Sequence, residues 1–421
     1  MMIFQKPKKT VSQPEWHEDL IREVLLKLPV KSLLRFKQVS KAWLQMVTSK
    51  AFISDHYSVA RNRQSHPSFF VIRNPIYNKY RAVNVITQIS MDASGIRTDK
   101  NIPLRFIGRC RERYTFPVFF PMGFGLYCIF ELLSQTVVLW NLGTRKFEVL
   151  PLSPYRDRAN PEQDPSFCFA HVDNEFSYKV GLLSVRRYSE NKNSVLVQRL
   201  QLYSSSSGSW KVIQIPEGSV VGYYMADGVN LNGKYHILST DSKNQEHDYN
   251  HGGFEEENDN NYIYDYHIMT FNYASEVFGR IEVPDPPQII GRYNLMDKSF
   301  LISNDGILLC LVIPWVNEDV NNEMFLDMWV MHDYGAKESW SKEHTIGPIS
   351  NNMHGLGYSK SVRGFFLQDS DSQLYLFKCA SSAAERIILH HLNFEMTNVQ
   401  VIELTTESLI PIKGTRRSGL N

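Results

Sequence analysis

The hydrophobic pattern of the chain changes its period near residue 60. Before that point, apolar residues recur at the three- and four-residue spacing of an amphipathic helix, and the clearest stripe is Leu20, Val24 and Leu28. Pro29 ends this helix, because proline lacks the backbone N–H and disfavours helical geometry at the residue before it. We therefore expect a first helix of about three turns that stops just before Pro29.

Two further short helices are predicted before the pattern changes. Ser32 can cap the second helix, and Val39, Trp43 and Val47 mark one side of the third. Three helices in about forty residues bury only a small core, so this all-α module is expected to lean on a partner.

From about residue 67 onward the period is two, which is typical of β-strands. Short runs rich in Val, Ile, Tyr and Phe alternate with Gly, Asn, Asp and Ser, as in residues 126–130, 137–140 and 267–272. No long amphipathic helix separates these runs. The pattern therefore favours an antiparallel all-β domain over a parallel sheet.

A weak repeat underlies the β pattern. Apolar runs end in a proline at intervals of 48 to 68 residues, and an aromatic residue on a turn precedes several of them. The prolines are Pro103, Pro151, Pro216, Pro284 and Pro348. Radial repetition of four-stranded blades gives such spacing, so we predict a propeller-like domain of about six blades. A pair of β-sandwiches is the alternative, because each unit could contribute strands to two sheets.

Composition narrows the function classes. The 421 residues include 43% hydrophobic and 21% charged residues, with a formal net charge of +1, which is ordinary for a globular protein. This balance gives no global reason to bind nucleic acid or an anionic membrane. The five cysteines are far apart and show no zinc or redox spacing, and no signal peptide begins the chain. We therefore expect the cytoplasm or the nucleus.

One insertion stands out by its charge. Residues 241–265 contain eight acidic residues and one lysine, so they cannot add much to a core and are predicted to form an exposed loop. The loop is either a solvated spacer or a site for a basic ligand. Four residues are the candidate substrate contacts: Glu255, Glu256, Glu257 and Asp259.

A search for catalytic motifs finds none. Dinucleotide and phosphate loops, a nucleophile elbow and a helical zinc motif are all missing, so no catalytic residue, cofactor or metal is expected. A propeller hydrolase with carboxylates paired across its mouth stays open as an alternative. Residues 1–60 hold ten basic and five acidic residues, but the apolar third helix argues against a DNA-reading helix and for a protein-binding one.

Residues 16–43 resemble a plant F-box almost position by position, although Trp16-His17 replaces the usual opening Leu-Pro. The resemblance implies docking onto a Skp-family adaptor and, through it, a cullin scaffold. The adaptor contacts that it implies are Leu20, Ile21, Leu25, Leu28, Pro29, Leu33, Leu34 and Trp43. Leu34 and Trp43 could equally serve only the core.

Residues from about 120 to 410 resemble the F-box-associated, kelch-like domain of plant F-box proteins. The matching pieces include 139–141, 209–210, 276–278 and 328–335. Residues 229–233, together with the acidic insertion, look most like the S-locus F-box branch, whose members act in self-incompatibility by recognising pistil S-ribonucleases. We accordingly divide the chain into a disordered N-terminus (1–14), an F-box (15–60), a β-propeller-like domain (61–412) and a flexible tail (413–421).

The resemblance implies a non-catalytic subunit of an SCF (Skp-cullin-F-box) ubiquitin ligase. Its β-domain would capture a protein substrate, an S-ribonuclease being one candidate, for ubiquitination and proteasomal degradation. A protein-binding scaffold without a role in degradation is the alternative.

Overall fold

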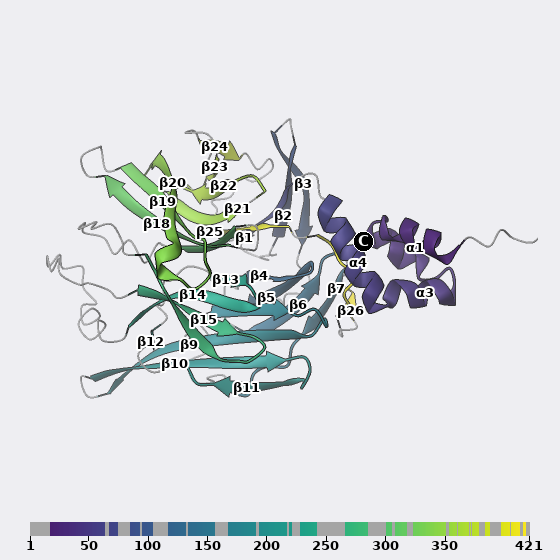
Figure 1. Cartoon of the computed structure of the whole chain (residues 1–421), viewed down its shortest axis with the longest axis horizontal. Coiled ribbons are helices and arrows are strands. Elements are labelled where there is room, and N and C mark those ends of the chain that lie inside the picture. Colours follow the sequence, from purple (N-terminus) through teal and green to yellow (C-terminus); the bar gives the residue numbers. More distant parts are fainter. Residues whose placement is uncertain are drawn as a thin grey trace, which may run out of the picture.

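The structure is a computed structural model of the 421-residue chain. It describes residues 17–63, 67–74, 85–92, 95–103, 117–131, 134–155, 167–190, 193–216, 219–220, 228–241, 266–284, 300–304, 308–317, 323–350, 353–359, 361–369, 371, 373–378, 384–387, 397–404, 406–412 and 416–417. A helical module lies at one end of a larger β-domain (Figure 1). Over the described part of the chain, no helix combines the length and apolar character needed to cross a membrane.

The helical module has four helices where the sequence predicted three. They are α1 (Glu18–Leu26), α2 (Val30–Phe36), α3 (Lys41–Thr48) and α4 (Lys50–Arg63). Pro29, not Ser32, is the N-cap residue of α2, because its fixed backbone angle suits the entry to a helix. The Ser40 hydroxyl caps α3 by accepting from the Trp43 N–H at 3.1 Å. Ser49 does the same for Phe52 at 3.2 Å, and so starts the unpredicted fourth helix.

Six antiparallel sheets follow, which we number as blades. Blade 1 contains β4 (Pro117–Gly123), β5 (Leu126–Glu131), β6 (Thr136–Asn141), β7 (Lys146–Val149) and β26 (Arg416–Arg417). Blade 2 contains β8 (Phe167–Val172), β9 (Tyr178–Glu190), β10 (Asn193–Ser204) and β11 (Ser209–Ile213). Blade 3 contains β12 (Ser219–Val220), β13 (Val229–Leu231), β14 (Lys234–Asp241), β15 (Tyr266–Asn272) and β16 (Phe278–Glu282).

The other three blades complete the ring. Blade 4 contains β17 (Phe300–Asn304), β18 (Leu308–Asn317), β19 (Glu323–Met331) and β20 (Trp340–Ile349), with a short 3-10 turn (Lys337–Ser339) before β20. Blade 5 contains β21 (His354–Ser359), β22 (Gly364–Gln368), β23 (Leu374–Lys378) and β24 (Ala384–Ile387). Blade 6 contains β25 (Thr397–Glu403), β1 (Ser68–Asn74), β2 (Val85–Asp92) and β3 (Gly95–Pro103). The prediction of about six blades is confirmed, and the sandwich alternative is wrong because each repeat forms one sheet.

The ring closes between segments from opposite ends of the chain. Strand β25 pairs antiparallel with β1, which places Ile402 opposite Phe70 in blade 6. The Gln400 side chain ties this blade to blade 1. Its Oε1 accepts from the Phe119 N–H at 2.9 Å, and its Nε2 donates to the Phe119 carbonyl at 2.8 Å. One amide thus serves both backbone groups of Phe119, much as a neighbouring strand would.

The structure explains why prolines and turn aromatics repeat together. The Trp210 indole N–H donates to the carbonyl of Pro151 at 2.7 Å, which joins blade 2 to blade 1. In the same way, Trp340 donates to the carbonyl of Glu282 at 2.9 Å and joins blade 4 to blade 3. The repeat in the sequence therefore marks contacts between blades.

The helices lie on one face of the propeller (Figure 1), which we call the proximal face. The β4–β5 turn reaches it, because Phe124 in that turn packs on Tyr57 of α4. In a propeller the turns after the first and third strands of every blade share a face. The end of β14, the start of β15, the end of β18 and the start of β19 therefore lie on the opposite, distal face. Arg416 and Arg417, in the predicted flexible tail, pair with Phe147 and Lys146 as β26.

Candidate functional site

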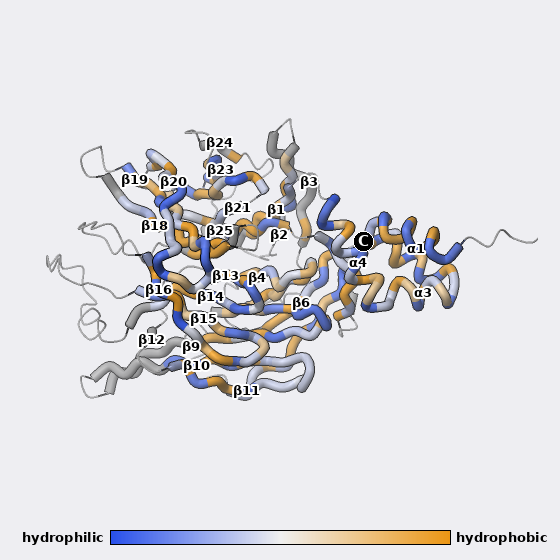
Figure 2. The backbone as a smooth tube through the Cα atoms, viewed as in Figure 1, coloured by the Kyte–Doolittle hydropathy of each residue, from blue (hydrophilic) through white to orange (hydrophobic). Residues whose placement is uncertain are grey.

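Helices α1 and α3 lie on the side of the helical module away from the propeller (Figure 1), and Figure 2 shows hydrophobic positions along these helices. Several apolar side chains of the module are exposed. Leu20 and Val24 of α1 are 54% and 59% exposed, Val39 after α2 is 60% exposed, and Leu44 of α3 is 43% exposed. We call these four residues the apolar helix surface. Single exposed apolar residues are common, but four on one small module indicate a surface that another protein covers.

The other predicted adaptor contacts lie between this surface and the core. Pro29 is exposed, whereas Ile21, Leu28, Leu34 and Trp43 are half-buried and pack against the core. The Trp43 ring meets the Phe36 ring edge to face, with centroids 5.5 Å apart. Trp43 therefore serves the core with part of its side chain and keeps another part accessible.

Two predicted contacts are buried instead. Leu25 is 1% exposed and Leu33 is not exposed, so in this conformation neither side chain can touch an adaptor, and both belong to the core. On the same helix, Leu20 and Val24 face outward while the neighbouring Leu25 faces inward. Val24, Val39 and Leu44 were not among the predicted contacts. Val24 could have been identified from the sequence, because it lies four residues after Leu20, a predicted contact, and therefore on the same helical face.

The helical module and the propeller share one continuous apolar core. Leu25, Leu33, Val47 and Phe52 belong to the same buried cluster as propeller residues such as Leu139. The contact is close at the β6–β7 turn, where a Cβ on Gly143 would lie 3.2 Å from Val30 Cγ1 and 3.0 Å from the Ser408 carbonyl oxygen. The orientation of the helices relative to the blades is therefore fixed by packing.

Residues 408–412 pack together with the helices, and we call this segment the floor under the helices. Its residues Leu409, Ile410 and Ile412 lie in the shared core. The buried Asn141 at the end of β6 holds this segment, because its Nδ2 donates to the carbonyls of Ser408 and Ile410 at 3.2 and 2.9 Å. Its Oδ1 accepts from the Thr144 N–H at 2.9 Å. Asn141 thus uses both ends of its amide in the interior.

Helix α4 adds contacts at the rim of this interface. The Tyr57 and Phe124 ring centroids are 5.1 Å apart, and Phe124 meets Phe176 of the β8–β9 turn at 6.0 Å. Burial raises the pKa of the Tyr57 hydroxyl. The Lys50 ammonium pairs with the exposed carboxylate of Glu175, which adds little because water screens it. His56, buried in α4, donates from Nε2 to the Leu28 carbonyl at 2.8 Å.

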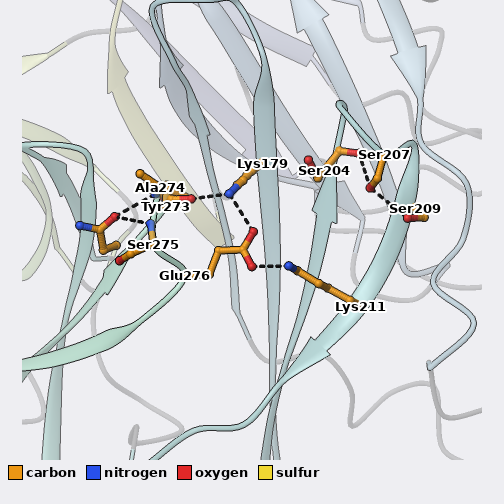
Figure 3. Close-up of polar contacts among 10 residues, drawn as sticks. Lys179, Ser204, Ser207, Ser209, Lys211, Tyr273, Ala274, Ser275 and Glu276 are labelled. Atoms are coloured by element: carbon orange, nitrogen blue, oxygen red, sulfur yellow. Dashed lines mark hydrogen bonds and ion pairs between the residues drawn. The ribbon is translucent and has the colours of Figure 1, made fainter.

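A polar bridge joins blades 2 and 3 on the proximal face (Figure 3). The Lys179 ammonium donates to Glu276 Oε1 at 2.8 Å and to the carbonyl of Tyr273, and Lys211 donates to Glu276 Oε2. Burial alone would raise the pKa of the Glu276 carboxyl, but the hydrogen bonds from the two lysines outweigh it, so its pKa lies below the ordinary value.

Because of this bridge, part of the free energy of unfolding of the protein depends on pH. A carboxyl with a lowered folded-state pKa stabilises the fold above its ordinary pKa of 4.5 and loses this effect as the pH falls. We expect Glu276→Gln to be less stable than the wild type at pH 7, and the gap to shrink progressively below pH 4.5. Thermal unfolding of both proteins across this range measures it. The exposed Glu338 provides the control as Glu338→Gln, and a gap for Glu276→Gln that is constant with pH would contradict the assignment.

The predicted acidic substrate contacts, Glu255, Glu256, Glu257 and Asp259, lie outside the described residues. Strands β14 and β15 flank this insertion, and the end of β14 and the start of β15 lie on the distal face. Within the described residues, no group of three or more His, Cys, Asp or Glu side chains is placed to hold a metal ion.

Comparisons with known proteins match both parts of the chain. Residues 16–55 match the F-box domain, and residues 123–408 match the F-box associated beta propeller domain. An F-box/kelch-repeat protein of Arabidopsis thaliana is 22% identical over 373 residues, which cover 86% of this chain and 87% of the relative. A putative F-box protein of the same plant is 26% identical over 341 residues, covering 75% and 72%.

The similarity of this chain to solved structures is low. An ulvan lyase of a polysaccharide lyase family gives a TM-score of 0.42 at 12% identity and covers 77% of each chain. A nidogen/laminin complex gives 0.40 at 7% identity, covering 80% of this chain and 98% of that one. Such scores support no functional comparison. The match over residues 123–408, with the F-box that precedes it, shows that this chain belongs to the F-box proteins with an F-box associated β-propeller domain.

Proposed function

We propose that this protein is the substrate-recognition subunit of an SCF ubiquitin ligase. The observation that carries the proposal is the apolar helix surface, which lies within the residues that match the F-box domain. A Skp-family adaptor is the partner whose binding would cover it, and a cullin scaffold joins through the adaptor. The protein supplies no catalytic group of its own, and it acts in the cytoplasm or the nucleus.

The shared core gives this arrangement a mechanism. Because the helices and blades are packed into one body, an adaptor on the apolar helix surface fixes where the distal face points. A substrate held there is kept at a high effective concentration relative to a ubiquitin-conjugating enzyme on the same scaffold. Positioning alone then promotes transfer of ubiquitin to a substrate lysine.

Capture of the full chain by a panel of purified Skp-family adaptors tests the proposal. We expect at least one adaptor to bind and to bring a cullin into the complex. Failure of every adaptor would contradict the ligase role and would favour a scaffold that binds proteins without degrading them.

For the substrate we propose a basic protein on the distal face, with an S-ribonuclease the first to test. This rests on sequence, because the acidic residues of the insertion are outside the described range. Neutralising Glu255, Glu256, Glu257 and Asp259 together should slow association several-fold at low salt and weaken its salt dependence. Stopped-flow or surface-binding rates measure this effect. An unchanged on-rate would contradict steering by the insertion.

A further inference from the structure

A pair of aromatic rings lies at the distal end of blade 4, outside the contacts described so far. Strands β18 and β19 pair antiparallel, which places Trp315 opposite Phe325 and Asn317 opposite Glu323. Opposite residues share a face of a sheet, as do residues two apart on one strand. Trp315, Phe325 and Glu323 therefore lie on the same face, close to the β18–β19 connection.

The two rings form a stack. Their centroids are 4.6 Å apart and their planes differ by 18°. Phe325 also rests on the backbone of β20, where a Cβ on Gly347 would lie 2.5 Å from Phe325 Cδ1. Trp315 therefore lies on the side of the stack away from β20. Strand β17 begins at Phe300, opposite Val312, so no described strand flanks Trp315 on its other side.

Trp315 offers ring carbon to a ligand rather than a hydrogen-bond donor. Its side chain is half-buried, and its indole nitrogen is fully covered, with no acceptor among the residues that the structure describes. Packing alone would explain a fully covered ring. A half-buried tryptophan that stacks on a second ring can attract a cation to the negative face of its indole ring.

The charge next to the stack has the matching sign. Glu323 lies one register pair further along the same face, and no ion pair involves it within the described chain. Asp327, on the same face, is buried and already accepts from the Thr345 hydroxyl at 2.6 Å and from the Lys342 ammonium at 3.3 Å. Glu323 is therefore the carboxylate that is available to an incoming cation.

We propose that Trp315, Phe325 and Glu323 form a contact site for a cationic side chain, arginine or lysine, of a protein bound to the distal face. The cation lies over the ring face of Trp315 that is turned away from Phe325, and the Glu323 carboxylate pairs with it. This contact site deepens the proposed function. It rests on that function only because we treat the bound protein as a substrate.

The experiment uses the full chain and two peptides of equal length. Hexa-arginine is the probe, and hexa-citrulline is its neutral counterpart of nearly the same shape. We expect hexa-arginine to bind and to change the tryptophan fluorescence, and hexa-citrulline to do neither. Trp315→Leu should weaken hexa-arginine binding by about 3- to 30-fold, the range expected for a cation on an aromatic face. The matched control is Tyr155→Leu, because Tyr155 is an exposed aromatic residue in the segment after β7, and this variant should leave binding unchanged.

Two further variants distinguish a loss of binding from a folding defect. Glu323→Gln changes almost no volume and should weaken binding and reduce its salt dependence. Trp315→Phe keeps a ring, so it should bind more tightly than Trp315→Leu but lose the fluorescence change. Hexa-arginine binding that is equal in the wild type and in folded Trp315→Leu, or equal binding of both peptides, would overturn the proposal. Adaptor capture on the same preparations separates this result from a failure of the ligase proposal.

Discussion

A chain carrying Leu20→Asp and Val24→Asp should lose adaptor capture almost completely. Both side chains are more than half exposed, so the carboxylates stay in water and the fold keeps its stability. In the complex the same carboxylates would be buried without partners against an apolar surface. A loss of about 2 kcal/mol for each anchor corresponds to roughly a 1,000-fold weaker affinity for the pair. Titration of an adaptor with wild type and variant measures the difference.

The control for this prediction places the same charge elsewhere on the module. Ala51 is exposed in the first turn of α4, where an acidic residue suits the helix dipole, so Ala51→Asp should fold and bind normally. Leu25→Ala is a contrasting core variant, because it should lower the free energy of unfolding by about 2–4 kcal/mol through a cavity in the shared core. Normal capture by the Leu20/Val24 double variant would show that the adaptor does not use the apolar helix surface.

Asn141→Ala should cause the second large effect, a loss of about 2–4 kcal/mol in the free energy of unfolding. The substitution removes three hydrogen bonds, two of them buried, and leaves the carbonyls of Ser408 and Ile410 without their donor. A buried polar group without a partner costs about 1–3 kcal/mol. Urea unfolding measures the total, and limited proteolysis should show the segment around Ile410 becoming accessible first.

The specificity of this effect can be checked with another asparagine. Asn174 lies exposed in the β8–β9 turn, and Asn174→Ala should change stability by less than about 0.5 kcal/mol. If Asn141→Ala unfolds at the same urea concentration as the wild type, the hydrogen bonds do not hold the floor under the helices. Equal protease resistance around Ile410 would lead to the same conclusion.

The period of the hydrophobic pattern was enough to predict the main architecture. Spacing of three and four residues indicated helices, and the recurring prolines indicated blades, because both reflect local geometry. The fourth helix was missed since its apolar residues Phe52 and Ile53 form no long stripe. Its start depends on the Ser49 cap, which a sequence pattern shows only weakly.

The candidate site could be predicted only in part, because burial depends on distant segments. Leu25 and Leu33 look like their exposed neighbours in the sequence, and they are buried because they belong to the cluster that the helices and the propeller share. Part of this cover is the Ile410 segment, which Asn141 holds from 269 positions away. The stack of Trp315 and Phe325 likewise requires the register of two strands, which one sequence does not reveal.

Closure of the ring by β25 has a consequence for how the protein is made. Ribosomes deliver the helices and the first three strands of blade 6 long before β25 emerges, so the ring must stay open through most of synthesis. The floor under the helices is made later still. A prematurely terminated chain would thus lack both the closing strand and the support that orients its F-box, which restricts a correctly oriented F-box to products translated almost to the end.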